Sequence, residues 1–245
     1  MKISRRLFLI NSAASAAALT VLPGCLSTAK DESGSDVTAI DTVLEPDATM
    51  VQHAEAANEL LRQDFPKGFA LDATHHPHIS CLQRFVKTKD LDKVYDAVDK
   101  ILAEEKPATW KLTAYKYYYL PWKDIGLGGI VIKPTDDLIR YQQKLIDAIT
   151  PFTVKTGAAA AFVTTPEDPD INQPTIDYVE NFVPDETGDK FNPHVTIGLA
   201  TQDYLKKLMD EKFDDFTFSP TGVSVYHLGN YGTARTQLHH WELQS

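Results

Sequence analysis

Several features are scarce in this sequence, and each shortage excludes a class of protein. Only 12 of the 245 residues are glycine and 14 are proline, which excludes collagen-like and low-complexity chains. Two cysteines are too few for a disulfide framework or a cysteine zinc site. Basic residues are also few: 24 Lys and Arg against 34 Asp and Glu give a net charge of −10, so the positive field that attracts duplex nucleic acid is absent. The remaining composition, 43% hydrophobic and 24% charged residues, is typical of one globular domain.

The first 25 residues have the features of an export signal. Arg5 and Arg6 form a twin-arginine start, and the apolar, small-residue stretch that follows, Leu9 to Leu22, is too short to span a membrane permanently. The stretch ends in Leu22-Pro23-Gly24-Cys25, which resembles a bacterial lipobox. We therefore expect residues 1–24 to be a Tat-type lipoprotein signal peptide and Cys25 to carry the lipid. The alternative is an uncleaved anchor or a chance arginine pair.

This interpretation predicts an exported protein that is lipid-anchored to a bacterial membrane, on its periplasmic or cell-surface side. Cleavage before Cys25 removes three basic residues, so the mature charge is 21 minus 34, or −13. Residues 25–48, rich in Ser, Thr, Asp and Ala, are predicted to be the lipidated cysteine and a flexible tether. Residues 49–245 are then predicted to be the folded domain, which we expect to be a monomer.

Helix-like and strand-like hydrophobic patterns alternate through the domain, which favours an α+β fold. The helical spacing predicts four helices: Met50 to Arg62, Asp90 to Glu105, Thr135 to Ile149 and Thr201 to Lys212. Thr135 and Thr201 are predicted N-caps. The strand-like runs are Pro77 to Val86, Trp110 to Leu120, Gly128 to Ile132, Ala158 to Val163, His194 to Leu199, Phe216 to His227 and Thr236 to Leu243. The segment Thr164 to Lys190, with its prolines, glycines and acidic residues, is predicted to be a long loop.

Two of the eight histidines lie in nearly identical local sequences. Pro77-His78-Ile79-Ser80-Cys81 and Pro193-His194-Val195-Thr196-Ile197 both read Pro-His-aliphatic-hydroxyl-apolar. Because side chains alternate along a strand, His78 and Ser80 are expected on one face and Ile79 and Cys81 on the other. His194 and Thr196 are expected to share a face in the same way. The two strands could therefore present two imidazoles and two hydroxyls to one cleft.

That set of side chains suits the cleavage of a phosphodiester. One group must take a proton from the attacking oxygen and another must protonate the leaving oxygen, and imidazoles with a pKa near 6.5 can do both near neutrality. The hydroxyls of Ser80 and Thr196 could donate hydrogen bonds to the nonbridging phosphate oxygens. This scheme requires no cofactor.

The paired motifs resemble those of the 2H phosphoesterase superfamily, in particular its bacterial 2′-5′ RNA ligase and cyclic phosphodiesterase branch. The resemblance rests on residues 77–86 (PHISCLQRFV), 191–198 (FNPHVTIG) and 228–238 (LGNYGTARTQL). It implies a pseudo-symmetric, two-lobed α+β fold with antiparallel sheets around a central cleft and helices outside. It also implies that His78 and His194 are catalytic and that Ser80 and Thr196 bind phosphate. The first motif has Ser where many members of the superfamily have Thr, which keeps the hydroxyl but loses the methyl group.

The expected function is a metal-independent phosphodiesterase for 2′,3′-cyclic or 2′-5′-linked nucleotide phosphoesters, with a small nucleotide or short oligonucleotide as partner. A nucleotide- or phosphate-binding lipoprotein without turnover, and ligase-type transesterification, are the alternatives. A metal site is not predicted, because neighbouring histidines such as His75 and His76 point to opposite faces of a strand and no carboxylate lies at ligand spacing. Arg84 would share the catalytic face only if its strand were unbroken. Stacking of a base on Trp122 or Tyr231 is also open.

Overall fold

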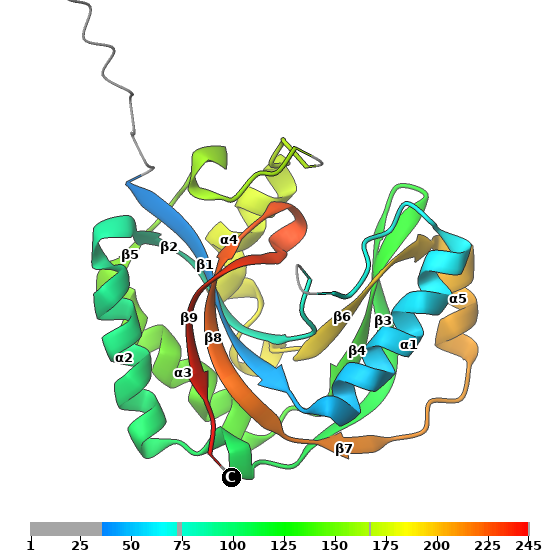
Figure 1. Ribbon diagram of the computed structural model, residues 1–245, viewed down its shortest axis with the longest axis horizontal. Coiled ribbons are helices and arrows are strands. Elements are labelled where there is room, and N and C mark those ends of the chain that lie inside the picture. The colour runs from blue at the N-terminus through cyan, green and yellow to red at the C-terminus, as the bar shows by residue number, and fades with distance from the viewer. Residues whose placement is uncertain (1–35, 73–74, 167, 245) are drawn as a thin grey trace, which may run out of the picture. The chain divides into compact units, whose positions relative to one another are not determined.

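The computed structural model describes residues 36–72, 75–166 and 168–244, which form one antiparallel sheet with helices packed on it (Figure 1). The strand order is β7-β3-β4-β6-β2-β1-β8-β9, with β5 beside β2. The strands are β1 (Val37–Pro46), β2 (Ile79–Lys87), β3 (Leu112–Trp122), β4 (Ile125–Ile132), β5 (Thr153–Val154), β6 (His194–Thr201), β7 (Phe216–Phe218), β8 (Pro220–Leu228) and β9 (Ala234–Glu242). All pairings between these strands are antiparallel, so the predicted α+β class is confirmed.

Among the described residues, four of the five helices, all except α2, begin where a side chain accepts a hydrogen bond from a free backbone N–H group. They are α1 (Ala48–Asp64), α2 (Leu91–Glu104), α3 (Asp136–Ile149), α4 (Gln173–Asp185) and α5 (Gln202–Asp210). Thr135 accepts a hydrogen bond from Leu138 N and Thr201 accepts one from Tyr204 N, so both predicted N-caps are confirmed. None of the helices in the described ranges is both long enough and apolar enough to cross a bilayer.

The sheet consists of two halves that meet at one paired position. The strands β7, β3, β4 and β6 form one half, covered by α1 and α5, and β2, β1, β8 and β9 form the other, with α3 and α4 packed on β2. Ile79 of β2 pairs with Val195 of β6, and both side chains are fully buried in the main core with Leu61 of α1 and Leu145 of α3. This arrangement agrees with the predicted two-lobed architecture.

The prediction that residues 25–48 form a tether is wrong from residue 37 onwards. Residues 37–46 form β1, a central strand that pairs with β2 on one side and with β8 on the other. Ile40, Val43 and Leu44 are fully buried, so this strand is part of the core and the domain starts before residue 49. A run rich in β-branched residues outweighs its polar composition here, because both of its neighbours supply backbone hydrogen bonds. The first 24 residues and Cys25 lie outside the described residues.

Three other predictions need correction. The segment Thr164 to Lys190 is not one long loop, since it contains α4, which Asn172 caps through Thr175 N. Buried side chains of α4, such as Ile176 and Val179, pack in a second cluster with Phe85. The predicted strand Ala158 to Val163 is instead a short 3-10 turn, Ala159–Ala161. The predicted strand Phe216 to His227 is two strands, β7 and β8.

Candidate active site

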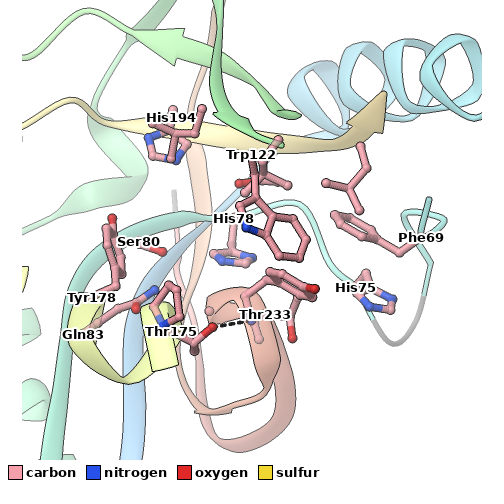
Figure 2. Close-up of a pocket in the computed structure, with 18 of the residues that line it drawn as sticks. Phe69, His75, His78, Ser80, Gln83, Trp122, Thr175, Tyr178, His194 and Thr233 are labelled. Carbon is pink, nitrogen blue, oxygen red and sulfur yellow. Dashed lines mark hydrogen bonds between the residues drawn. The ribbon is translucent and has the colours of Figure 1, made fainter. Parts of the chain in front are cut away.

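A cavity of about 250 Å³ lies where the two halves of the sheet meet (Figure 2). All four predicted site residues line it: His78, Ser80, His194 and Thr196. The junction of β2 and β6 explains their arrangement. Continuing the register of the Ile79–Val195 pair places His78 across from Thr196 and Ser80 across from His194. The two motifs are therefore related by the local twofold symmetry of an antiparallel pair.

The strand alternation that the sequence predicts is confirmed at both motifs. Ile79, Cys81, Val195 and Ile197 are buried on the core side, whereas the four polar residues face the cavity. Cys81 is 1% exposed, and burial raises the pKa of its thiol far above its usual value. In this environment the thiol stays protonated and unreactive.

Both histidines are held by equivalent hydrogen bonds. Nδ1 of His78 lies 2.6 Å from the carbonyl oxygen of His76, and Nδ1 of His194 lies 2.8 Å from that of Asn192. A carbonyl only accepts, so Nδ1 carries the proton in each ring. Nε2 of each neutral imidazole is then the basic nitrogen. The same carbonyl, two residues before the histidine, fixes the tautomer in both motifs.

Burial lowers the pKa of both imidazoles from the ordinary value of 6.5. The loss of solvation is the largest cause in each case, and the hydrogen bond to the backbone carbonyl acts in the opposite direction. For His194 the neighbouring His78 also lowers the pKa. Both rings are therefore mainly neutral at pH 7.

The surroundings of the two Nε2 atoms differ. Nε2 of His194 is 2.8 Å from the hydroxyl of Tyr118, which donates to it, and burial raises the pKa of that phenol well above its usual value. Nε2 of His78 is 3.9 Å from a carboxylate oxygen of Asp41. The symmetry of the backbone is therefore not repeated in the chemistry around each ring.

The hydrogen bonding of the two hydroxyls, those of Ser80 and Thr196, also differs between the two motifs. The Ser80 hydroxyl donates to Asp41 Oδ2 at 2.5 Å. Within residues 36–72, 75–166 and 168–244, the Thr196 hydroxyl has no hydrogen-bond partner. Thr196 can therefore donate to a ligand as it stands, whereas the Ser80 proton is already engaged.

A bulge in β2 decides which further residue of the strand faces the cavity. The register against β1 shifts so that Thr42 pairs with Leu82 and Val43 with Ser80, which leaves Cys81 without an opposite residue. Gln83 therefore lines the cavity and donates to Asp41 Oδ2 at 3.0 Å. Arg84 is not among the lining residues, so the unbroken strand that would have placed it there does not exist.

Several residues of the site are not predicted by the sequence. Asp41 falls within the predicted tether, although an aspartate within a β-branched run could have marked a strand with a buried acid. Tyr118 belongs to a run of aromatic residues in which the pattern alone does not separate core positions from site positions. Tyr178 also lines the cavity, and its helix, α4, falls within the predicted loop.

The outer part of the cavity is apolar and aromatic. Trp122 and Tyr231 line it, are 40% and 44% exposed, and have ring centroids 5.3 Å apart in an edge-to-face contact. Phe69 and Leu120 extend this wall. Of the described residues that line the cavity, none is Lys, Arg, Asp or Glu.

No metal-binding group was found in the described part of the chain. In the described ranges, no three or more His, Cys, Asp and Glu side chains lie close enough together to hold an ion. His75 stacks on Phe69 with ring centroids 4.8 Å apart, and it lies near Asp72.

Comparison with known proteins supports the fold. No protein-family model matches the sequence, and no curated protein matches it. The crystal structure of TT0787 of Thermus thermophilus has a TM-score of 0.50 and 13% identity, over 84% of this chain and 98% of that chain. E. coli LigT complexed with 3′-AMP has a TM-score of 0.42 and 13% identity, over 86% of this chain and 100% of that chain. Kluyveromyces marxianus Usb1 has a TM-score of 0.40 and 8% identity, over 86% and 98%.

The likeness to TT0787 shows a shared fold along almost the whole length of that chain. The resemblance that the two histidine motifs indicate is thereby confirmed at the level of the fold.

Proposed function

We propose that this protein is a metal-independent phosphodiesterase that acts on 2′,3′-cyclic or 2′-5′-linked nucleotide phosphoesters by two-histidine acid–base catalysis. One observation carries the proposal. His78 and His194 occupy symmetry-related positions on β2 and β6, each with Nδ1 fixed by a carbonyl, and both line one cavity together with two hydroxyls. Two imidazoles held in this way can share the two proton transfers of phosphodiester cleavage.

In the proposed reaction a water molecule attacks the phosphorus and a ribose oxygen leaves. Nε2 of one neutral histidine accepts the proton of the attacking water, and the other histidine, protonated at Nε2, donates that proton to the leaving oxygen. The phosphorus–oxygen bond to the ribose breaks as the bond to water forms. Thr196 donates to a nonbridging oxygen and stabilises the charge that develops there. Either histidine can take either part in this scheme.

The lining of the cavity favours a small substrate with a single negative charge. The described residues that line the cavity include no Lys or Arg. The many phosphates of a long polyanion would therefore find no positive charges to neutralise them in the cavity. The net charge of −10 acts against a polyanion as well. A cyclic mononucleotide carries one charge on its phosphate and one flat base, which suits an apolar and aromatic outer wall.

The proposal includes export and lipid attachment at Cys25, which depend on the sequence of residues 1–25 alone. Because β1 begins at Val37, the tether would be residues 26–36 rather than a segment that reaches residue 48. Eleven fully extended residues span at most about 40 Å. Incorporation of labelled fatty acid tests this part: the wild type should be labelled and Cys25→Ala should not, whereas equal labelling of both would exclude Cys25 as the lipid-bearing residue.

The function is tested by turnover of 2′,3′-cyclic nucleotides in excess EDTA. We expect the wild type to hydrolyse them, and His78→Ala and His194→Ala each to lose about 10²- to 10⁴-fold in kcat while keeping the wild-type circular dichroism spectrum. His53→Ala is the matched control, because His53 is exposed on α1, stacked on Phe216, and does not line the cavity. It should keep full activity.

Other outcomes of this test point to the two alternatives. Binding of a cyclic nucleotide without turnover by a folded wild type would favour a nucleotide-binding lipoprotein. Joining of RNA ends in place of hydrolysis would favour ligase-type transesterification. A single histidine variant with full activity would contradict the two-histidine mechanism.

A further inference from the structure

Asp41 is a buried acid that contacts the cavity through side chains that line it. Its side chain is 0% exposed and does not line the cavity. Oδ2 accepts hydrogen bonds from Ser80 at 2.5 Å and from Gln83 at 3.0 Å, and both of these residues do line the cavity. Oδ1 has no hydrogen-bond partner among the described residues. An ionised carboxylate in this position is energetically costly, because it is buried and one of its oxygens lacks a hydrogen bond from the described residues.

The protonation state of Asp41 decides what Ser80 can offer to a ligand. A serine hydroxyl has one proton to donate. While Asp41 is ionised, that proton points at Oδ2, and a phosphate oxygen in the cavity meets only the lone pairs of Ser80 Oγ. If Asp41 is protonated, its own O–H can donate to Ser80 Oγ. The proton of Ser80 is then free to turn towards the phosphate.

The position of Asp41 makes this change accessible near neutral pH. Burial raises the pKa of the Asp41 carboxyl to about 7, although the hydrogen bonds from Ser80 and Gln83 lower it. An anion bound next to Ser80 would raise this pKa further, because like charges disfavour the ionised form.

At pH 8, each of the other titratable groups that pack around Asp41 stays in a single protonation state. Burial raises the pKa of Cys81 on β2, Tyr178 on α4 and Tyr226 on β8, so all three stay protonated. Burial lowers the pKa of His78, so this ring is neutral. Glu45, two residues after Val43 on the same strand, hydrogen-bonds to Ser224 and to Tyr226. Among these groups, Asp41 is the carboxyl in direct contact with Ser80.

We propose that Asp41 is a positioning residue of the phosphate site: it takes up a proton when an oxyanion binds, donates that proton to Ser80 Oγ, and so turns the Ser80 hydroxyl towards the oxyanion. The proton comes from the bulk solution: its bond to an Asp41 oxygen forms as its bond to hydronium or to a buffer acid breaks, and no other covalent bond changes. The proposal rests on the proposed function in one respect, that an oxyanion binds between the two histidine motifs. Thr196 needs no such partner, because its hydroxyl donates to none of the residues that the structure describes.

Proton uptake on sulfate binding tests the proposal without requiring turnover. Sulfate is a suitable probe, since its charge does not change between about pH 6 and pH 9. Calorimetry in buffers of different ionisation enthalpy gives the number of protons taken up per sulfate. At about pH 8 the wild type should take up about one proton more than Asp41→Asn, because the amide cannot be protonated. Because Nε2 of His78 lies 3.9 Å from Asp41 Oδ2, the same comparison is also made in a His78→Gln background, which removes any change in the proton uptake of that ring.

The same variant should also bind sulfate more tightly. With Nδ2 in the place of Oδ2, the amide that Asp41→Asn introduces can donate to Ser80 Oγ, as a protonated acid would, and to Oε1 of Gln83 once the Gln83 amide turns over. With a pKa of about 7, roughly a tenth of the wild type is protonated at pH 8. We therefore expect Asp41→Asn to bind sulfate about tenfold more tightly at pH 8 and almost equally at pH 6. In a Ser80→Ala background the substitution should give no such gain, which a merely structural role for Asp41 would not predict.

Asp90→Asn is the matched control, because Asp90 is another buried aspartate, paired with Lys93 and away from the cavity. It should leave proton uptake unchanged. Should Asp41→Asn fail to fold, the infrared difference spectrum of the wild type with and without sulfate at pH 8 should show the gain of one protonated carboxyl. Equal proton uptake in wild type and Asp41→Asn, no new protonated carboxyl, or no sulfate binding at pH 6 would overturn the proposal. Absence of nucleotide turnover would count against the proposed function only.

Discussion

The hydroxyl of Tyr118 lies 2.8 Å from Nε2 of His194, the nitrogen that faces the substrate in the proposed mechanism. Because Nδ1 of this ring donates to the Asn192 carbonyl, Nε2 is the acceptor and Tyr118 the donor. This hydrogen bond stabilises the neutral imidazole. Its counterpart at His78 is a carboxylate oxygen of Asp41, at the longer distance of 3.9 Å.

Removing the Tyr118 hydroxyl should therefore raise the pKa of His194. A hydrogen bond of about 1 kcal/mol to the neutral form corresponds to about 0.7 pKa unit. We expect Tyr118→Phe to move the His194 titration, followed by NMR of the ring protons, upward by about that amount. Tyr115→Phe is the control, since Tyr115 lies on the same strand without lining the cavity. A His194 titration that is unchanged or lower in Tyr118→Phe would contradict this account.

The pH dependence of hydrolysis should have its optimum on the acidic side of neutrality. The base must be neutral and the acid protonated in the free enzyme, and burial lowers the pKa of both His78 and His194 from 6.5. The rate therefore falls with acid below the lower of the two pKa values and with base above the higher one. We expect kcat/KM for a cyclic nucleotide to decline steadily above about pH 6.5. A plateau that extends to pH 8 would be inconsistent with these two residues as acid and base.

Trp122 and Tyr231 should hold the base of the substrate. Both side chains are partly exposed and line the apolar wall, and base stacking on an aromatic ring contributes about 1–3 kcal/mol. Trp122→Ala should raise KM for a 2′,3′-cyclic nucleotide by about tenfold or more and change kcat little. The cyclic phosphate of ribose without a base serves as control substrate and should show no such loss. An equal loss with both substrates would indicate that Trp122 supports the wall and does not stack on the base.

Asp41 should destabilise the fold at neutral and basic pH. Its pKa is about 7 in the folded protein and about 3.9 in an unfolded chain. Below pH 4 both states are protonated, and between about pH 4 and pH 7 the folded state alone holds the proton, so stability is lost as the pH rises through this window. Three pKa units correspond to at most about 4 kcal/mol.

Asp41→Asn removes this penalty while keeping a similar shape. The variant should unfold at a higher temperature than wild type at pH 8, and the difference should vanish near pH 4. Thermal unfolding followed by circular dichroism at the two pH values measures it. A variant that is less stable than wild type at pH 8 would show that the ionised carboxylate stabilises the fold.

The boundary of the domain can be tested by truncation. Removing residues 1–35 leaves β1 complete, whereas removing residues 1–48 takes away a central strand and Asp47, which caps α1. The chain from residue 36 should unfold cooperatively, and the chain from residue 49 should lack a cooperative transition, because β2 and β8 both lose a partner. Cooperative unfolding of the chain from residue 49 would instead support the domain boundary at residue 49 that the composition predicts.

Local sequence was enough to predict the four helices with strong apolar stripes, the capping roles of Thr135 and Thr201, and the strand faces of the two motifs. These features depend on side-chain periodicity over a few residues, which a single sequence displays. The resemblance to a known superfamily added the two-lobed fold. Neither source of information identified β1, although five of its first seven residues are β-branched. Its polar composition resembled a tether, and only the neighbouring strands β2 and β8 make it a strand.

The sequence by itself determined that His78, Ser80, His194 and Thr196 would face one way on two similar strands, because alternation along a strand is a local property. Tertiary structure alone decided that these strands meet at Ile79 and Val195 and that a bulge at Cys81 directs Gln83, and not Arg84, into the cavity. It also decided that Asp41 lies beneath Ser80 and Tyr118 beside His194. The first contact joins residues 39 positions apart in the sequence and the second joins residues 76 positions apart. A local sequence pattern cannot show which distant side chain will be buried next to a given hydrogen-bonding group, because that depends on how the strands pack.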